Sequence, residues 1–171
     1  MFKGRIAAFA LGLIAASANA EQDKWSYFEV PHIRTGEYRP EASLMSRNAL
    51  PLPAQNKEHN VGYLTIRKNA DGTDQVSLSV ETGRQLICAP GNCTVTISFD
   101  GKPPLPFQGT FDTDWRAARI VLQDSKTFLT NARQARKMTV SFREAANGLA
   151  TYNFEAASPL NFPAKIKRLN G

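Results

Sequence analysis

The chain has 171 residues, of which 42% are hydrophobic, and it carries 21 Lys and Arg against 15 Asp and Glu. This length is enough for one domain with a sizeable core. The basic residues are not clustered among aromatic residues, which argues against a nucleic-acid-binding protein, and no stretch after residue 20 is apolar and long enough to cross a membrane. We therefore expect a solvated surface with a mild attraction to anionic partners.

The first 20 residues are predicted to be a signal peptide. Lys3 and Arg5 form a positively charged start, residues 6–16 are apolar, and Ala18-Asn19-Ala20 is a cleavage site of the small-x-small type. Cleavage leaves a single mature domain, 21–171, with 19 basic residues (21 minus 2) against 15 acidic ones, a net charge of +4. We expect this domain to be periplasmic, with extracellular release as the alternative.

An aromatic patch opens the mature domain. Trp25, Tyr27 and Phe28 lie in a segment, 25–30, that fits one strand before Pro31 interrupts it. These three side chains are candidate contact residues for a partner.

The rest of the N-terminal segment, 21–60, is predicted to be irregular. Ser43–Asn48 fits a short helix or turn, and the Leu-Pro-Leu-Pro sequence at 50–53 must be extended, because each proline disfavours helix in the residue before it. His32 and His59 are far apart and have no acidic residue at ligand spacing. We expect them to be surface residues and not metal ligands.

Regular strands are predicted from Val61 onward. Residues 63–67 and 75–81 alternate apolar and polar side chains, as a half-buried strand does, and a turn signal follows each of them. Residues 84–88 and 93–99 continue this organisation. The four segments predict an antiparallel meander with short connections.

Cys88 and Cys93 are the only cysteines, and they flank the sequence Ala-Pro-Gly-Asn, which suits a type II turn. In an exported chain the two cysteines most simply form a disulfide that fixes one hairpin. A redox-active pair is the alternative, but their spacing is not the C-x-x-C of thiol oxidoreductases. Two thiols without a nearby histidine also make a poor zinc site.

The segment 102–106, Lys-Pro-Pro-Leu-Pro, is predicted to be a rigid bend at a sheet edge, followed by strands over 107–111 and 119–122. A helix is then predicted from about Lys126 to Arg136, capped by Asp124-Ser125. Its apolar face contains Phe128, Leu129, Ala132 and Ala135. Its last turn contains Arg133, Arg136 and Lys137, where cations favour the negative end of the helix dipole. A binding role for these three cations is the alternative.

Two further strands, 138–143 and 149–156, are predicted to be joined by a hairpin turn at Asn147-Gly148, and 161–171 form a basic tail. The sheet core would span 61–160, with its helix near 125–136. About eight short strands and one helix predict a mainly β fold. We expect an antiparallel β-sandwich or a strongly bent sheet with the helix packed across it.

No catalytic constellation is present. The sequence lacks Gly-x-Ser-x-Gly, a phosphate loop and His-Glu-x-x-His. Asp100, Asp112 and Asp114 raise two alternatives, a calcium site and a hydrolase with dispersed carboxylates. The segment lacks the glycine and distal glutamate of the twelve-residue calcium loop, and aspartates in turns are commonly solvated surface groups. We therefore expect neither an enzyme nor a metal site.

Several segments resemble a set of uncharacterised proteobacterial exported proteins. The motifs are Ser46-Arg47-Asn48-Ala49-Leu50, Leu64-Thr65-Ile66-Arg67, Gly83–Cys88, Cys93–Asp100, the helix around Phe128 and the segment Tyr152–Leu160. The resemblance covers most of the mature chain and implies an exported β-rich domain. It brings no known catalytic residues, and some of the similar proteins look like accessory proteins encoded with secretion systems.

The leading hypothesis is a non-catalytic interaction module that binds an envelope or secreted protein, without cofactor, metal or nucleic acid. Its candidate contact residues are Trp25, Tyr27, Phe28, Arg133, Arg136 and Lys137. The alternative is an inhibitor or immunity-type protein against a secreted hydrolase, which would present the stiff 102–106 segment to the enzyme.

Overall fold

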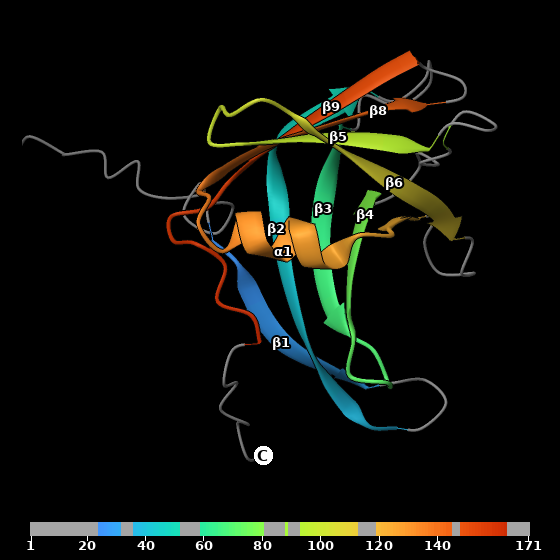
Figure 1. The fold of residues 1–171 in the computed structure, drawn as a ribbon, viewed down its shortest axis with the longest axis vertical. Helices are drawn as coiled ribbons and strands as arrows, with labels where there is room; N and C mark the ends of the chain where they lie inside the picture. Colours follow the sequence, from blue (N-terminus) through green and yellow to red (C-terminus); the bar gives the residue numbers. More distant parts are fainter. Residues whose placement is uncertain are drawn as a thin grey trace, which may run out of the picture.

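The computed structural model describes residues 24–31, 36–51, 59–80, 88, 93–112, 119–144 and 148–163. The predicted mainly β class with one helix is confirmed (Figure 1). The elements are β1 (Ser26–Pro31), β2 (Tyr38–Pro51), β3 (His59–Lys68), β4 (Asp74–Val80), β5 (Thr94–Phe99), β6 (Leu105–Asp112), β7 (Arg119–Leu122), α1 (Ser125–Ala132), β8 (Lys137–Glu144) and β9 (Gly148–Glu155).

The strands form one antiparallel sheet that closes on itself. Their order is β1-β2-β3-β4-β7-β6-β5-β8-β9, and β9 also pairs with β2. Strands β2 to β9 therefore form an eight-stranded barrel. Strand β1 is added outside the closed ring, where it pairs with residues 38–43 of β2. The expectation of a sandwich or a strongly bent sheet is corrected in one respect: the sheet closes into a barrel and does not form a sandwich.

The alternation of apolar and polar residues places one face of each strand inside the barrel. One cross-strand row consists of Leu44, Leu64, Leu78 and Ile120, which lie opposite one another on four neighbouring strands. All four are at most 1% exposed. Burial of each such side chain contributes about 1.5–3 kcal/mol, so the interior rows stabilise the barrel.

The Ser-x-Asn motif of β2 joins the first and last strands of the barrel. Ser46 lies opposite Phe154 of β9. The Asn48 side chain donates to the Thr151 carbonyl oxygen at 2.8 Å and accepts from the Asn153 backbone N–H at 2.6 Å. An amide side chain thus replaces a backbone pair at a bulge in β2, and the barrel closes there.

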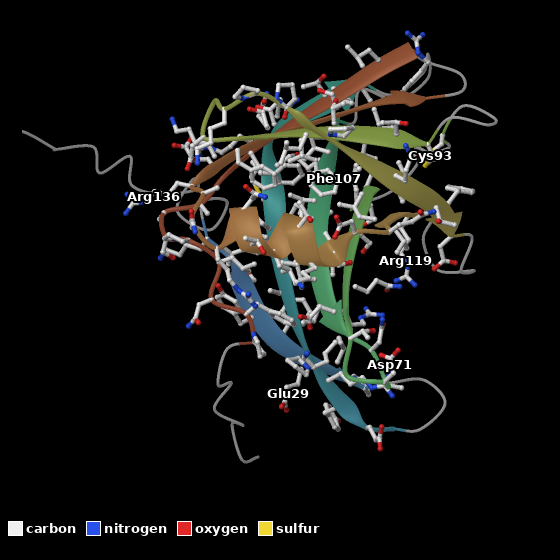
Figure 2. All side chains as sticks on the ribbon, viewed as in Figure 1. Glu29, Asp71, Cys93, Phe107, Arg119 and Arg136 are labelled. Atoms are coloured by element: carbon white, nitrogen blue, oxygen red, sulfur yellow. A yellow bond between two sulfur atoms is a disulfide. The ribbon has the colours of Figure 1, made fainter. Side chains whose placement is uncertain are left out.

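The helix α1 packs against the inner side of the sheet. Asp124 accepts a hydrogen bond from Thr127 N at 3.0 Å, which confirms the predicted cap. Phe128 is fully buried and contacts Phe99 and Phe107, with ring centroids 5.7 and 6.3 Å away. Figure 2 shows Phe107 pointing from β6 into this interior. Within the described ranges, no helix is long and apolar enough to cross a bilayer.

Three predictions about organisation are wrong. Most of the N-terminal segment that we expected to be irregular is strand, including Ser43–Asn48, which lies within β2. The four-strand meander is not formed, because β5 lies between β6 and β8 while β4 lies between β3 and β7. The helix ends at Ala132, so Arg133 is its C-cap and Lys137 begins β8.

Candidate functional site

The connection between β5 and β6 is a tight, preformed turn. Lys102 N donates to the Phe99 carbonyl oxygen at 3.0 Å, and the two central residues, Asp100 and Gly101, have φ values of 50° and 73°. Two consecutive positive φ angles define a type I′ turn, in which Asp-Gly is a favoured pair. The Ser98 hydroxyl donates to the Lys102 carbonyl oxygen at 2.7 Å and holds the outgoing chain.

Asp100 fastens this turn to the connection between α1 and β8. Its Oδ1 accepts the backbone N–H groups of Lys137 at 2.8 Å and Arg136 at 2.9 Å, and its own N–H donates to the Lys137 carbonyl oxygen at 2.8 Å. These two N–H groups, first that of Lys137, lower the pKa of Asp100, and the charges of Lys102 and Arg136 lower it further. Asp100 is therefore a structural carboxylate, which counts against the calcium and hydrolase alternatives for this residue.

The chain after the turn projects into solvent. Every residue from 101 to 106 is exposed, and we call this segment the proline loop. Leu105 is 37% exposed, although its backbone already lies opposite Ile97 of β5. Prolines 103, 104 and 106 fix φ on both sides of Leu105. The 102–106 segment is thus exposed, but the predicted sheet edge is wrong, because β6 lies between β7 and β5 in the closed sheet.

Three cations lie in the proline loop or are tied to its base through Asp100: Lys102, Arg136 and Lys137, which we call the cationic rim. These three side chains are exposed, as is that of Arg133, the C-cap of α1. Lys137 Nζ lies 3.3 Å from Glu155 Oε1, and Arg133 Nη2 donates to the Phe162 carbonyl oxygen at 3.0 Å. The structure therefore brings two predicted contact residues, Arg136 and Lys137, together with the 102–106 segment, which lies about 30 residues earlier in the sequence. The third, Arg133, is directed to Phe162 instead.

The aromatic patch does not form one surface. Trp25 is only 5% exposed and belongs to the core, whereas Phe28 is 37% exposed on the opposite face of β1. The Tyr27 hydroxyl accepts the Asn161 backbone N–H at 2.9 Å. Of the three aromatic residues predicted as contacts, Phe28 is the one with a substantially exposed side chain.

Residues 156–163 connect the two predicted contact regions. Ala156 N donates to the Arg136 carbonyl oxygen at 2.7 Å, Phe162 accepts from Arg133, and Asn161 reaches Tyr27. In Figure 1 this segment (red) runs down the left side from β9 towards β1, on the side where the β5–β6 connection also projects. Arg136 points outward on that side in Figure 2.

The disulfide between Cys88 and Cys93 is confirmed, with a Cα–Cα distance of 4.9 Å. Cys88 is 8% exposed, and the turn predicted between the two cysteines lies outside the described residues. A disulfide of this kind is consistent with an exported protein. The signal peptide and His32 also lie outside the described residues.

The other predicted carboxylate sites do not converge. Asp112 Oδ2 accepts from Arg119 Nη2 at 2.8 Å and from Arg119 Nε at 3.0 Å, a charge-assisted pair at the end of the β6–β7 ladder. Asp114 is outside the described residues. In the part of the chain that the structure describes, no three His, Cys, Asp or Glu side chains are grouped as metal ligands would be.

A cavity of about 680 Å³ lies between the β3–β4 turn and α1. Its two acidic side chains are engaged: Asp74 Oδ1 lies 2.8 Å from Lys68 Nζ, and Asp124 caps α1. Arg133 is the predicted contact residue that lines it, together with Asn69, Thr73, Gln75, Lys126 and Thr130. This cavity could not be predicted from local sequence patterns, because its walls come from segments about 50 residues apart.

No family model matches the sequence, and no curated protein matches it. Among solved structures, the chain is similar to the crystal structure of invasion associated protein B from Bartonella henselae. The two share 15% sequence identity over 78% of this chain and 85% of that chain, with a TM-score of 0.45.

Proposed function

We propose that this chain is an exported, non-catalytic interaction module that binds an envelope or secreted protein. The observation that carries the proposal is the anchoring of the proline loop by Asp100, which joins an exposed loop and the cationic rim into one face. We propose the periplasm as its compartment, on the basis of the predicted signal peptide and the disulfide.

Pre-organisation is the physical reason for this assignment. Binding through a mobile loop costs about 1–2 kcal/mol for each residue whose backbone must be ordered. In the proline loop most of that cost is met during folding, because the turn bonds, the prolines and Asp100 already hold the backbone. A loop that is both exposed and held in this way supports a binding role better than a catalytic one.

The test is affinity capture from the periplasm with the oxidised mature domain, at low and physiological salt. We expect one partner that is retained at physiological salt and lost when Leu105 is replaced by Asp. Leu149→Asp is the matched control, because Leu149 is 72% exposed at the start of β9, outside the face. Captures that all vanish as salt rises would mean diffuse cationic attraction and would contradict the proposal.

The second candidate is an inhibitor of a secreted hydrolase. It is favoured by one observation: Leu105 is exposed and is followed by Pro106, so the peptide bond after it has no N–H and is fixed in an extended strand. Such a segment can bind in the cleft of an enzyme without a change in its own backbone conformation. Assays of secreted peptidases and other hydrolases with equimolar domain test this candidate, which requires inhibition that Leu105→Asp abolishes.

A further inference from the structure

We infer that the partner presents carboxylate side chains around a recess that receives Leu105. This inference rests on the proposed function and specifies the chemistry of the surface that the proline loop and the cationic rim would contact. The argument comes from three features of the face: the balance of its charges, the position of Leu105 among them, and the rigidity of both.

The carboxylates of the described residues do not balance the charges of the face. Asp100 already accepts two backbone N–H groups, and Glu155 lies 3.3 Å from Lys137 and 3.7 Å from Arg47. In the part of the chain that the structure describes, these two carboxylates stand against the three cations of the rim and Arg47. A complementary surface must therefore supply negative charge, and carboxylates are the groups with which Arg and Lys form charge-assisted hydrogen bonds.

Leu105 gives the face an exposed apolar side chain. It follows Lys102 by three residues, and the rim residues Arg136 and Lys137 are tied to Asp100 at the base of the same loop. An apolar anchor with charged groups nearby fits the usual plan of a protein interface, which has a dry centre and a polar rim. The matching partner has a recess for one leucine side chain, surrounded by acidic residues.

A folded protein suits this face better than a bilayer or a nucleic acid. One exposed leucine supplies too little apolar area to anchor a protein in a membrane, and the large side chains of Phe28, Tyr38 and Leu149 that are exposed elsewhere belong to other elements. No aromatic residue lies in the proline loop or the cationic rim to stack on bases. Lys137 and Arg133 are also directed by their contacts with Glu155 and Phe162, unlike the mobile cations of a polybasic segment.

Carbodiimide cross-linking tests the inference, because it joins lysine amines directly to carboxylates. The oxidised mature domain is treated in the periplasmic fraction, and linked peptides are sequenced by mass spectrometry. We expect Lys102 to be joined to an Asp or Glu of the captured partner. Lys126, an exposed lysine on α1, is the control and should give no such link. Lys102→Arg keeps the charge, so it should abolish this link and leave the amount of captured partner unchanged.

A charge-reversal pair gives the second readout. The double variant Lys102→Glu/Arg136→Glu should reduce capture at physiological salt by about tenfold or more. The control Lys126→Glu/Arg143→Glu changes the net charge equally, with Arg143 at the far end of β8, and should stay within about twofold. Anionic phosphatidylglycerol vesicles should not bind the wild-type domain at this salt concentration.

The outcomes separate the inference from the proposed function. The inference is overturned if capture of the partner is lost with Leu105→Asp but unchanged with the charge-reversal pair. It is also overturned if the partner is cross-linked through Lys126. In both cases the proposed interaction module still stands. Vesicle binding that the charge-reversal pair abolishes would replace a protein partner by a membrane. A domain that captures nothing overturns both.

Discussion

The side chain of Asn48 and the backbone of Asn153 meet at 2.6 Å across 105 residues of sequence, at the point where the barrel closes. The same amide donates to the Thr151 carbonyl oxygen, so one side chain satisfies a donor and an acceptor of β9. The Ser46 hydroxyl supports it by donating to the Asn48 carbonyl oxygen at 2.6 Å. The Ser-x-Asn motif is therefore a closure device for the fold.

Asn48→Ala should lower the free energy of unfolding by about 1–3 kcal/mol, because two polar groups of β9 lose their partner at a half-buried position. Denaturant unfolding of the oxidised mature domain measures the change. Asn131→Ala is the control. The Asn131 side chain also donates to a backbone carbonyl oxygen, that of Thr127, but this hydrogen bond lies on the exposed side of α1. Its loss should lower the free energy of unfolding by less than half as much. Equal losses would show that Asn48 contributes nothing special to closure.

Gly62→Ala should be destabilising by about 1–3 kcal/mol through overpacking. A Cβ at this position would lie 2.8 Å from Cδ1 and 2.9 Å from Cγ of Tyr152, whose fully buried ring cannot move outward. Thermal unfolding of the single variant and of Gly62→Ala/Tyr152→Leu measures the clash. The smaller side chain should recover part of the loss, and a strictly additive double variant would contradict this explanation.

Replacement of Asp100 should change the pH dependence of stability. Its pKa is lowered in the folded state from an ordinary value of 3.8, so its contribution is complete above about pH 5 and is lost as pH falls below 3.8 and through the folded pKa. Asp100→Asn should lower the melting temperature by about 2–4 °C at pH 7. The difference from wild type should shrink below pH 4.

Asp100→Gly is the companion variant, because glycine keeps the positive φ of 50° while it removes the carboxylate. It should also lower the melting temperature at pH 7, and its difference from wild type should shrink below pH 4 in the same way. A difference that stays constant from pH 7 to pH 3 would mean that the ionised carboxylate is not what holds the turn.

Reduction of the Cys88–Cys93 disulfide should lower the free energy of unfolding by about 2 kcal/mol, the small end of the usual range, because the closed loop is short. Unfolding with and without a reductant measures this, and Cys88→Ser/Cys93→Ser should match the reduced protein. Thiol titration of the unfolded, unreduced protein should find no free cysteine. A stable free thiol would instead restore the redox-active alternative.

Local patterns were sufficient for most of the strands. Alternation identified β4, β5, β7, β8 and β9 to within one or two residues, because each has one face in the barrel and one towards solvent. Alternation did not identify β2, because this long strand has a proline near each end and the polar Ser-x-Asn motif interrupts its pattern. The side chains of that motif contact β9 and Gly62, and such distant contacts leave no periodic signal in the sequence.

The candidate face was predicted only in pieces. The 102–106 segment and the cations Arg136 and Lys137 could be recognised separately, since prolines and charges are visible in sequence. Their union depends on the Asp100 carboxylate, which the sequence suggested as a surface acid or a metal ligand. The Asp-Gly pair at the end of a strand was the available signal, because it is typical of a type I′ turn with positive φ at both residues.

The bond from Asn161 N to the Tyr27 hydroxyl spans 134 residues and ties the beginning of the described chain to its end. Together with the β2–β9 closure, it makes this fold rich in contacts between distant parts of the sequence, and such proteins fold slowly. During synthesis β1 and β2 are made first, and neither contact can be completed until β9 and residues 156–163 have followed. The exposed edge of β2 must therefore be protected from other chains during that delay.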